Sequence, residues 1–366
     1  MNPPAAPRAS VVVAVHGRTE KTLACLDSMA AQSLARDRAA LDLIVIDDGS
    51  PDATADAVRA WIARHPQVQA TLLENGRNLG ANASRNRGIA AARARIVAFI
   101  DSDCVADREW IERLIAPFAD PTVGAVSGLV DDTPSGNLWE LLFRGTHRLP
   151  RRGPTGRIVI GNLAVRREIL LALPLDESRP TRRMAGSDRP DIAISARSDE
   201  EGLNIALHEA GWRVLAEPSA RVVHDHPYSR ASLLRQAYFG GQSAAEIVWK
   251  YRLGPRKDLG PVLLLDLALV AALAALPWLG TTALIAPAVA ALLPIAAIGY
   301  NELANKGKTP LELLRIAPAL VLYYHVRLAG YLTRRLQLML GQRPIARVRV
   351  DELARLLPSP GSEEGR

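Results

Sequence analysis

The sequence predicts an α/β protein with a mostly parallel sheet flanked by helices, followed by an apolar helical region near the C-terminus. Three observations lead to this prediction. Short runs of β-branched and other apolar residues alternate with helical patterns over residues 10–130, which is typical of βαβ units. Polar residues follow these runs repeatedly, at the position where such sheets bind ligands. Two apolar stretches of about 20 residues, enough to cross a bilayer, begin at Pro261.

The first part of the chain supplies four predicted strands and three predicted helices, bounded by turn residues. The strands are expected at residues 10–17, 41–50, 68–75 and 95–103. The helices are expected at residues 20–34, 51–65 and 81–94. The second helix opens with proline and acidic residues, as a first turn should.

Residues 131–230 are less regular. The stretch 176–198 is rich in charge, Pro and Gly and is expected to be a mobile loop. After it we expect a helix that ends at Gly211, a strand around Val214, a turn at Pro218 and a last strand that ends near His224.

Composition narrows the class of protein. The net charge of +7 and the pI near 9.7 suit an acidic partner such as nucleic acid, an anionic membrane or a phosphate-bearing substrate. Cys25 and Cys104 are the two cysteines, which excludes a disulfide scaffold and a CxxC metal site. Cys104 has no evident activating partner, so we do not expect it to be a nucleophile.

The C-terminal region predicts a membrane hairpin. Spans are expected at about 261–280 and 281–300. The segment 313–335, which contains His325 and Arg327, is expected to be interfacial or re-entrant. Basic residues flank the pair of spans on both sides, which places both ends in the cytoplasm. The alternative is a pair of buried core helices in a soluble domain. The predicted division is a flexible N-terminus 1–9, a sheet domain 10–230, a linking helix 231–258, a membrane-associated region 259–340 and a polar tail 341–366.

Asp101 and Asp103 follow the fourth predicted strand. Residues i and i+2 of an extended segment point the same way, and paired carboxylates hold Mg²⁺ or Mn²⁺ against substrate phosphates. The sequence therefore predicts a metal site here, with a solvated Asp-Ser-Asp turn as the alternative.

Two further stretches are candidate donor-binding segments. Asp47 or Asp48 could accept hydrogen bonds from a base or a ribose, or these residues could simply form a turn in which Ser50 caps the next helix. Gly80 marks a tight turn before a helix that carries Arg85 and Asn86, which could hold ribose or phosphate. Neither a G-x-G-x-x-G pattern nor a P-loop is present.

These motifs together resemble those of the family 2 glycosyltransferases. The likeness lies in "VVVAVHGR", "LIVIDDGSPD", "NLGANASRNRGI", "VAFIDSDC", "GNLAVRRE" and "SDEEGLNIALHEAGWRV" with "VHDHP", in the family's order over residues 10–230. The resemblance implies a GT-A fold, a nucleoside-diphosphate sugar donor, a divalent metal (Mn²⁺ or Mg²⁺) and a hexosyltransferase that inverts the anomeric carbon.

The resemblance also implies roles for individual residues. It places the donor nucleotide against Val15, Gly17, Asp47, Asp48, Gly80, Arg85, Asn86 and Asp101. It places the metal on Asp103, with Asp101 and His224 completing the site. It places the catalytic base at Glu200, where the family usually has Asp, with Asp199 beside it and Glu201 as a competitor for the role.

The expected acceptor is lipid-linked or a polysaccharide, reached at the cytoplasmic face of the inner membrane by a multi-pass protein with a cytoplasmic catalytic domain. Arg166 and Arg167 could bind an anionic acceptor such as a lipid-linked phosphate, and an exposed helix start is the alternative explanation for them. The nearest match to the family's processive Gln-x-x-Arg-Trp segment, at residues 235–242, lacks Arg-Trp, so we expect transfer of a single sugar. Membrane lipid is an expected partner and nucleic acid is not. The rival functions are a sugar-nucleotide nucleotidyltransferase and a non-catalytic membrane scaffold.

Overall fold

The structure is a computed structural model that describes residues 6–132, 137–145, 151–177, 201–225, 229–253, 259–279, 296, 298–342 and 347–361. The chain forms two compact units. Unit 1 comprises residues 1–133, 149–226 and 349–366, and unit 2 comprises residues 134–148 and 227–348. The two units are therefore interleaved along the chain, whereas the sequence predicts consecutive domains.

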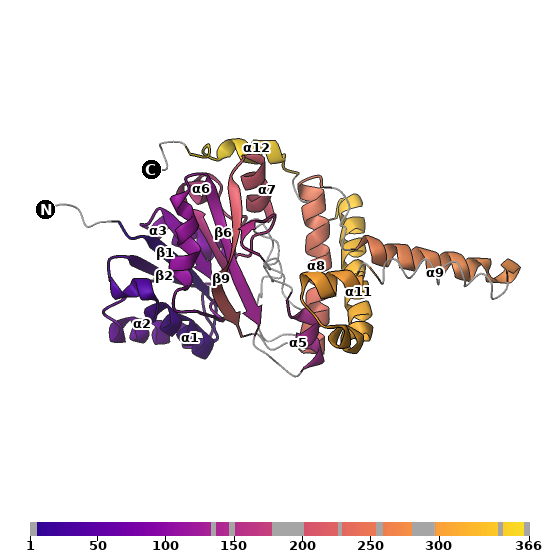
Figure 1. Cartoon of the computed structure of the whole chain (residues 1–366), viewed down its shortest axis with the longest axis horizontal. Coiled ribbons are helices and arrows are strands. Elements are labelled where there is room, and N and C mark those ends of the chain that lie inside the picture. Colours follow the sequence, from indigo (N-terminus) through magenta and orange to yellow (C-terminus); the bar gives the residue numbers. More distant parts are fainter. Residues whose placement is uncertain are drawn as a thin grey trace. The chain divides into compact units, whose positions relative to one another are not determined.

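Unit 1 is built on a nine-stranded mixed sheet (Figure 1). Its strands are β1 (Ala9–Val15), β2 (Leu41–Asp47), β3 (Gln69–Glu74), β4 (Ile96–Ile100), β5 (Cys104–Ala106), β6 (Val123–Asp132), β7 (Gly153–Pro154), β8 (Asn162–Arg166) and β9 (Arg213–His224). Their order is β3-β2-β1-β4-β8-β6-β9-β5, and β7 pairs with β9. The strands β3, β2, β1 and β4 are parallel, and β8 runs antiparallel to both β4 and β6. The predicted parallel sheet is thus one half of a mixed one.

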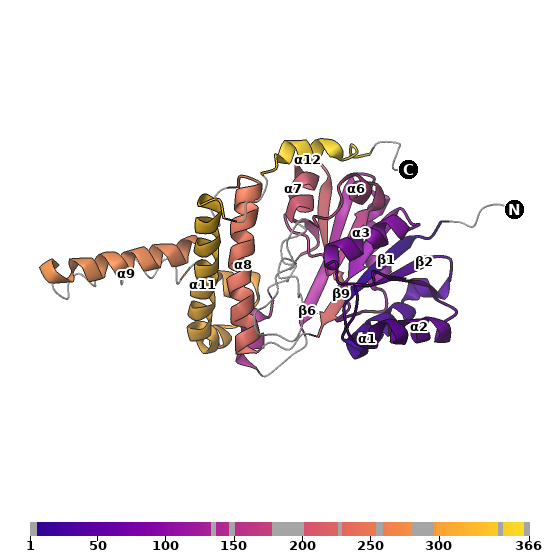
Figure 2. The ribbon, with the colours of Figure 1, turned by 180° about the vertical axis from the view of Figure 1, so that it is seen from behind.

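Helices cover both faces of this sheet. They are α1 (Thr19–Ala30), α2 (Thr54–Arg64), α3 (Ala81–Ala91), α4 (Trp110–Ile115), α6 (Arg167–Ala172), α7 (Glu201–Glu209) and α12 (Val350–Leu356), with short 3₁₀ turns at Ser33–Arg36 and Ala116–Ala119. One core packs α1, α2 and α4 against the sheet, and a second packs α3, α6 and α7 against the other face. Figure 2 shows these two layers from behind.

The strand sequences explain these two cores. In β1, Val11 and Val13 point into the first core and Val12 into the second, because side chains alternate across a strand. A strand that is covered on both faces consists of a near-continuous run of apolar residues. This is why "VVVAV" and "LIVI" identify buried parallel strands in the sequence.

The structure confirms the four predicted strands and three predicted helices of residues 10–103. It corrects two details. The helix α2 begins at Thr54, with Ala53 as its N-cap residue, so Ser50 does not cap it. The predicted turn at Pro218 is an irregularity within one continuous strand, β9, where its register with β6 shifts between Gly128 and Leu129. Most of the predicted loop 176–198 lies outside the described residues.

Unit 2 is helical, with α5 (Leu138–Phe143), α8 (Arg230–Lys250), α9 (Gly260–Leu279), the π-helix η4 (Asn301–Asn305) and α11 (Pro310–Met339). Capping boxes start two of these helices, at Ser229 for α8 and Thr309 for α11. The helices α8 and α11 approach closely, since a Cβ on Gly241 would lie 1.9 Å from the Arg327 carbonyl oxygen.

The predicted apolar segments fall in this unit. The first predicted span coincides with α9, and the segment 313–335 lies within α11. The second predicted span, 281–300, lies mostly outside the described residues. Across the part of the chain that the structure describes, no helix is both long enough and apolar enough to cross a membrane.

Candidate metal and donor site

The candidate site lies at one edge of the sheet in unit 1, where β4 ends. The strand stops at Ile100, and Asp101–Asp103 form a turn closed by a hydrogen bond from the Cys104 N–H to the Asp101 carbonyl oxygen (3.0 Å). The two carboxylates are therefore not on an extended segment, as the sequence argument assumed. They are delivered by a turn and have different partners.

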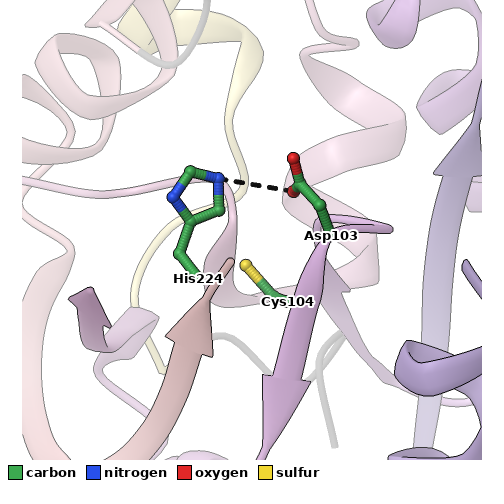
Figure 3. Close-up of side chains that lie close together, drawn as sticks. All are labelled: Asp103, Cys104 and His224. Carbon is green, nitrogen blue, oxygen red and sulfur yellow. Dashed lines mark ion pairs between the residues drawn. The ribbon is translucent and has the colours of Figure 1, made fainter. Parts of the chain in front are cut away.

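Sheet register brings His224 to this turn. On β5 and β9, Cys104 pairs with His224, and on β6 and β9, Asp132 pairs with His224. The Nε2 atom of His224 consequently lies 3.4 Å from Asp103 Oδ1, and its Nδ1 atom lies 3.9 Å from Asp132 Oδ1. Figure 3 shows Asp103 and His224 side by side, with the Cys104 sulfur beneath them.

This cluster has the geometry and chemistry of a cation site. An oxygen of Asp103, the Sγ atom of Cys104 and a ring nitrogen of His224 all lie within 4.8 Å of one another. Burial, with Asp101 and Asp103 nearby, raises the pKa of Cys104 well above its ordinary value, so its thiol stays protonated and is a poor ligand. The carboxylate of Asp103 and the imidazole of His224 are thus the ligands that this cluster offers a divalent cation.

The acidic neighbours of His224 control its charge. Burial acts to lower the pKa of His224, but the nearby carboxylates of Asp103 and Asp132 outweigh it and raise this pKa to about 9. The imidazole is therefore a cation at neutral pH in the metal-free protein. The positive charge of His224 offsets the repulsion between the carboxylates of Asp103 and Asp132.

Asp101 belongs to a separate contact. Its Oδ1 atom accepts a hydrogen bond from Arg85 Nη2 (2.9 Å), and Arg85 is itself buried on α3. Arg85 also donates to Asn82 (3.2 Å). On the other side, a Cβ on Gly161 would lie 2.5 Å from Asp101 Oδ2. The lack of a side chain at Gly161 therefore leaves room for this carboxylate. These contacts fix Asp101, and the cation cluster found among the described residues does not include it.

The loops after β1 and β2 are tied together. The Gly17 N–H donates to Ser50 Oγ (2.7 Å), and the Asp48 N–H donates to the carbonyl oxygen of Val15 (2.7 Å). Asp47 accepts the Ser50 N–H (3.1 Å) and its hydroxyl. The hydroxyl of Ser50 therefore joins the two loops.

Asp48 shapes the next loop along the edge. It is buried and accepts hydrogen bonds from the Leu79 N–H (2.8 Å), the Gly80 N–H (2.9 Å) and Asn75 (2.8 Å). Asn86 bonds to the carbonyl oxygen and N–H of Leu175 (2.8 and 3.0 Å). The structure thus gives these predicted donor-binding residues internal partners that set the shape of the loops.

Two cationic side chains near the candidate cation site, those of Arg18 and Lys21, were not predicted from the sequence as site residues. Arg18 Nη1 lies 2.6 Å from Asp103 Oδ2, and Lys21 Nζ lies 3.1 Å from Asp225 Oδ2. Arg18 follows the first predicted strand, at the end where such sheets bind ligands. This position was the one feature of the sequence that could have identified it. Lys21 and Asp225 carried no signal, because their proximity depends on the pairing of β5 with β9.

Two of the three candidate bases, Asp199 and Glu200, lie outside the described residues, and Glu201 is the first residue of α7. The predicted acceptor role of Arg166 is contradicted by its contacts. It is buried and donates to the carbonyl oxygens of Val123 (2.8 Å) and Asp120 (3.0 Å). Arg167 likewise donates to the carbonyl oxygen of Ile89 (3.2 Å).

The chain is similar to known glycosyltransferases. A pre-mycofactocin glycosyltransferase of Mycobacterium tuberculosis is 31% identical over 207 residues, which cover 56% of this chain and 42% of that protein. An N-acetylglucosaminyltransferase of Bradyrhizobium diazoefficiens is 27% identical over 345 residues, covering 85% of this chain and 68% of that protein. This chain thus spans less than half the length of the mycobacterial relative.

A solved structure supports the fold. The mannosyltransferase PcManGT of Pyrobaculum calidifontis, in complex with GDP-Man and Mn²⁺, superposes with a TM-score of 0.53 at 24% identity, covering 92% of this chain and 88% of that one. The model of the family "Glycosyl transferase family 2" matches residues 10–171, which include Asp103 and the strands of the parallel half-sheet. Residues 10–171 of this chain are therefore similar to glycosyl transferase family 2, and the sheet of unit 1 has a GT-A-like fold.

Proposed function

We propose that this protein transfers a single sugar from a nucleoside-diphosphate sugar to an acceptor hydroxyl, with inversion at the anomeric carbon. The observation that carries the proposal is the meeting of Asp103 and His224 at the edge of a GT-A-like sheet, 3.4 Å apart, in a chain with a family 2 glycosyltransferase segment. A carboxylate and an imidazole leave several coordination positions of a divalent cation for phosphate oxygens.

Asp103 and His224 would hold Mn²⁺ or Mg²⁺, which when bound supplies positive charge to the diphosphate leaving group. Asp47, Asp48, Gly80 and Arg85 would shape the nucleoside pocket through the loops that they fix. Asp101, held by Arg85 at 2.9 Å, would face the ribose. The backbone around Val15, Gly17 and Asn86 would also contribute to the nucleoside pocket.

The reaction needs a base on the face opposite the diphosphate. We assign this role to Glu200, with Asp199 and Glu201 as the neighbouring candidates. The base takes the proton of the acceptor hydroxyl, whose oxygen forms the new bond to C1. The bond from C1 to the phosphate oxygen breaks, and its electron pair leaves with the nucleoside diphosphate. Positioning and charge neutralisation supply most of the rate.

The donor is tested by release of nucleoside diphosphate from UDP-, GDP- and dTDP-sugars, including GDP-mannose, by membranes that carry the full chain. Release from one donor is expected to require Mn²⁺ or Mg²⁺ and to stop with EDTA. Asp103→Asn should lower the rate at least about 100-fold, because it removes a cation ligand. The control Asp56→Asn alters an exposed carboxylate on α2 and should not lower it.

The same assay locates the base. Glu200→Gln and Glu201→Gln keep the size of the side chain and remove its basicity, so the true base loses activity while the other variant keeps it. No release from any donor, with lipid extract supplied as acceptor, would contradict the proposed function.

We also propose that the protein acts at the cytoplasmic face of the membrane on a lipid-linked or saccharide acceptor. The support is a set of large apolar side chains that α9 leaves exposed, namely Leu264, Leu267, Val270 and Trp278, since exposed apolar patches mark interaction surfaces. After a carbonate wash, the full chain should float with lipid in a density gradient. Recovery in the aqueous fraction would contradict membrane attachment.

A further inference from the structure

Arg18 has a backbone conformation that a non-glycine residue rarely adopts. Its φ of 62° and ψ of 51° are left-handed, and Gly17 before it also has a positive φ of 70°. Such a conformation is disfavoured for residues with a Cβ, and it persists where the surroundings impose it. Here the Gly17 N–H is held by Ser50 Oγ (2.7 Å) and the Arg18 N–H by Asp52 Oδ2 (3.1 Å). The loops after β1 and β2 thus force Arg18 into this geometry.

The imposed backbone aims the guanidinium at the metal-site carboxylate. Arg18 Nη1 donates to Asp103 Oδ2 at 2.6 Å, while the other oxygen of Asp103 faces His224. The two partners differ in exposure, since 45% of the Arg18 side chain is exposed and 11% of the Asp103 side chain is. Asp103 is therefore fixed, and the long side chain of Arg18 has solvent into which it can move.

The other carboxylates beside the site have partners of a different kind. Asp101 is paired with Arg85, which is itself buried. Asp225 lies outside the cation cluster and is paired with Lys21. Asp103 is the carboxylate of the cation cluster, and its partners are His224 and the exposed Arg18. A divalent cation bound to Asp103 would repel this guanidinium at short range.

A diphosphate offers the displaced guanidinium a new partner. The planar fork of an arginine matches phosphate oxygens and can bind two of them at once. The departing nucleoside diphosphate carries more negative charge than the donor's diphosphate did, because the electron pair of the broken bond stays on its phosphate oxygen. A cation that reaches this oxygen stabilises the transition state more than the bound donor.

We propose that Arg18 pairs with Asp103 in the free protein and transfers to the donor diphosphate when the divalent cation takes Asp103. The proposal rests on the proposed glycosyltransferase function. It makes Arg18 a residue that weakens cation binding in the absence of nucleotide and strengthens nucleotide binding in the presence of the cation. The cation and the nucleotide then bind together more readily than either binds alone.

The test measures two affinities in the purified full chain. Free Mn²⁺ is followed by electron paramagnetic resonance without nucleotide, and the nucleoside diphosphate of the active donor is titrated calorimetrically at saturating Mn²⁺. Arg18→Met keeps an unbranched, flexible apolar stem and removes the guanidinium group with its charge. It is expected to tighten Mn²⁺ binding roughly tenfold and to weaken nucleoside diphosphate binding roughly tenfold, as expected for loss of one charged hydrogen bond in each state.

Two further variants serve as controls for the Arg18→Met result. Arg18→Lys keeps the charge and should restore both affinities in part. Arg59→Met removes an exposed arginine paired with Asp56 and Glu74 on unit 1 and should change neither. Tighter nucleotide binding, or Mn²⁺ binding that weakens or stays unchanged in Arg18→Met, would overturn the role of Arg18. Wild-type protein that binds neither Mn²⁺ nor any nucleoside diphosphate would instead contradict the proposed function.

Discussion

His224 connects two parts of the site, because Asp103 lies at one ring nitrogen and Asp132 at the other. Burying a histidine normally favours its neutral form, yet here two carboxylates favour the charged one. The same ring can therefore serve as a counter-ion in the metal-free protein and as a neutral ligand when a divalent cation replaces its proton.

This arrangement predicts how the stability of the metal-free protein depends on pH. The pKa of His224 is about 9 in the folded state, against 6.5 for an unperturbed histidine, so the folded state binds the proton more tightly than the unfolded chain does. The resulting stabilisation is complete below about pH 6.5 and is lost as the pH rises through about 9. The free energy of unfolding of unit 1 should fall by on the order of 3 kcal/mol over this range.

Urea unfolding in EDTA, followed by tryptophan fluorescence at pH 6.5 and 9, measures this change. His224→Gln cannot gain the proton, so its stability should vary much less between the two pH values. An equal fall in the wild type and in His224→Gln would assign the pH dependence to other groups.

At the residue scale, the resemblance placed Asp103 and His224 in one site, and the structure brings their side chains within 3.4 Å of one another. Their role as cation ligands stays a prediction. The sequence could not predict Asp132 as the second partner of His224, since that contact follows from the register of β6 with β9. It also misjudged Arg166, whose side chain bonds to backbone carbonyls inside the unit. An arginine next to a motif looks the same in the sequence whether it is buried or exposed.

At the scale of elements, strands β1 to β4 were predictable from the sequence, whereas the position of β8, which runs antiparallel to β4 and β6, was not. Strands buried on both faces read as near-continuous apolar runs, as in residues 43–46 and 96–100. The strand β8 is short, and its sequence "NLAVR" begins and ends with a polar residue, so it does not form a long apolar run. Its place is set by Asn162, which donates to the carbonyl oxygens of Leu129 and Ala220 (both 2.9 Å) and accepts from Trp110.

The contact between α8 and α11 leads to a prediction for unit 2. A Cβ on Gly241 would lie 1.9 Å from the carbonyl oxygen of Arg327, and one on Gly330 would lie 2.0 Å from that of Tyr238. Gly241→Ala must therefore push the two helices apart, at a cost of about 3 kcal/mol from overpacking.

Hydrogen exchange followed by mass spectrometry checks this at the level of each helix. In Gly241→Ala, the amides of α8 and α11 should exchange about 100-fold faster, while those of β1 to β4 stay unchanged. Gly260→Ala is the matched control, because nothing lies within 4 Å of a Cβ at that position. Unchanged exchange in Gly241→Ala would show that the helices do not depend on this close approach.

At the scale of the whole molecule, the sequence separates an α/β part from a helical part but misplaces the C-terminal segment. Residues 341–366 read as a polar tail, yet residues 349–366 belong to unit 1. There the Trp212 indole donates to the Pro358 carbonyl oxygen (2.8 Å), and Leu357 packs in the second core of the sheet. The sequence of a short helix with few apolar residues does not indicate that it packs against unit 1. Its docking depends on a surface formed by residues far away in the chain.

The central claim is that the edge of this sheet binds a divalent cation between Asp103, His224 and a diphosphate. Crystals of the full chain soaked with Mn²⁺ and a nucleoside diphosphate test it most directly, through anomalous scattering at the manganese edge. We expect one strong peak within coordination distance of Asp103, His224 and the phosphate oxygens. A bound nucleotide without that peak, or a peak away from Asp103 and His224, would contradict the account.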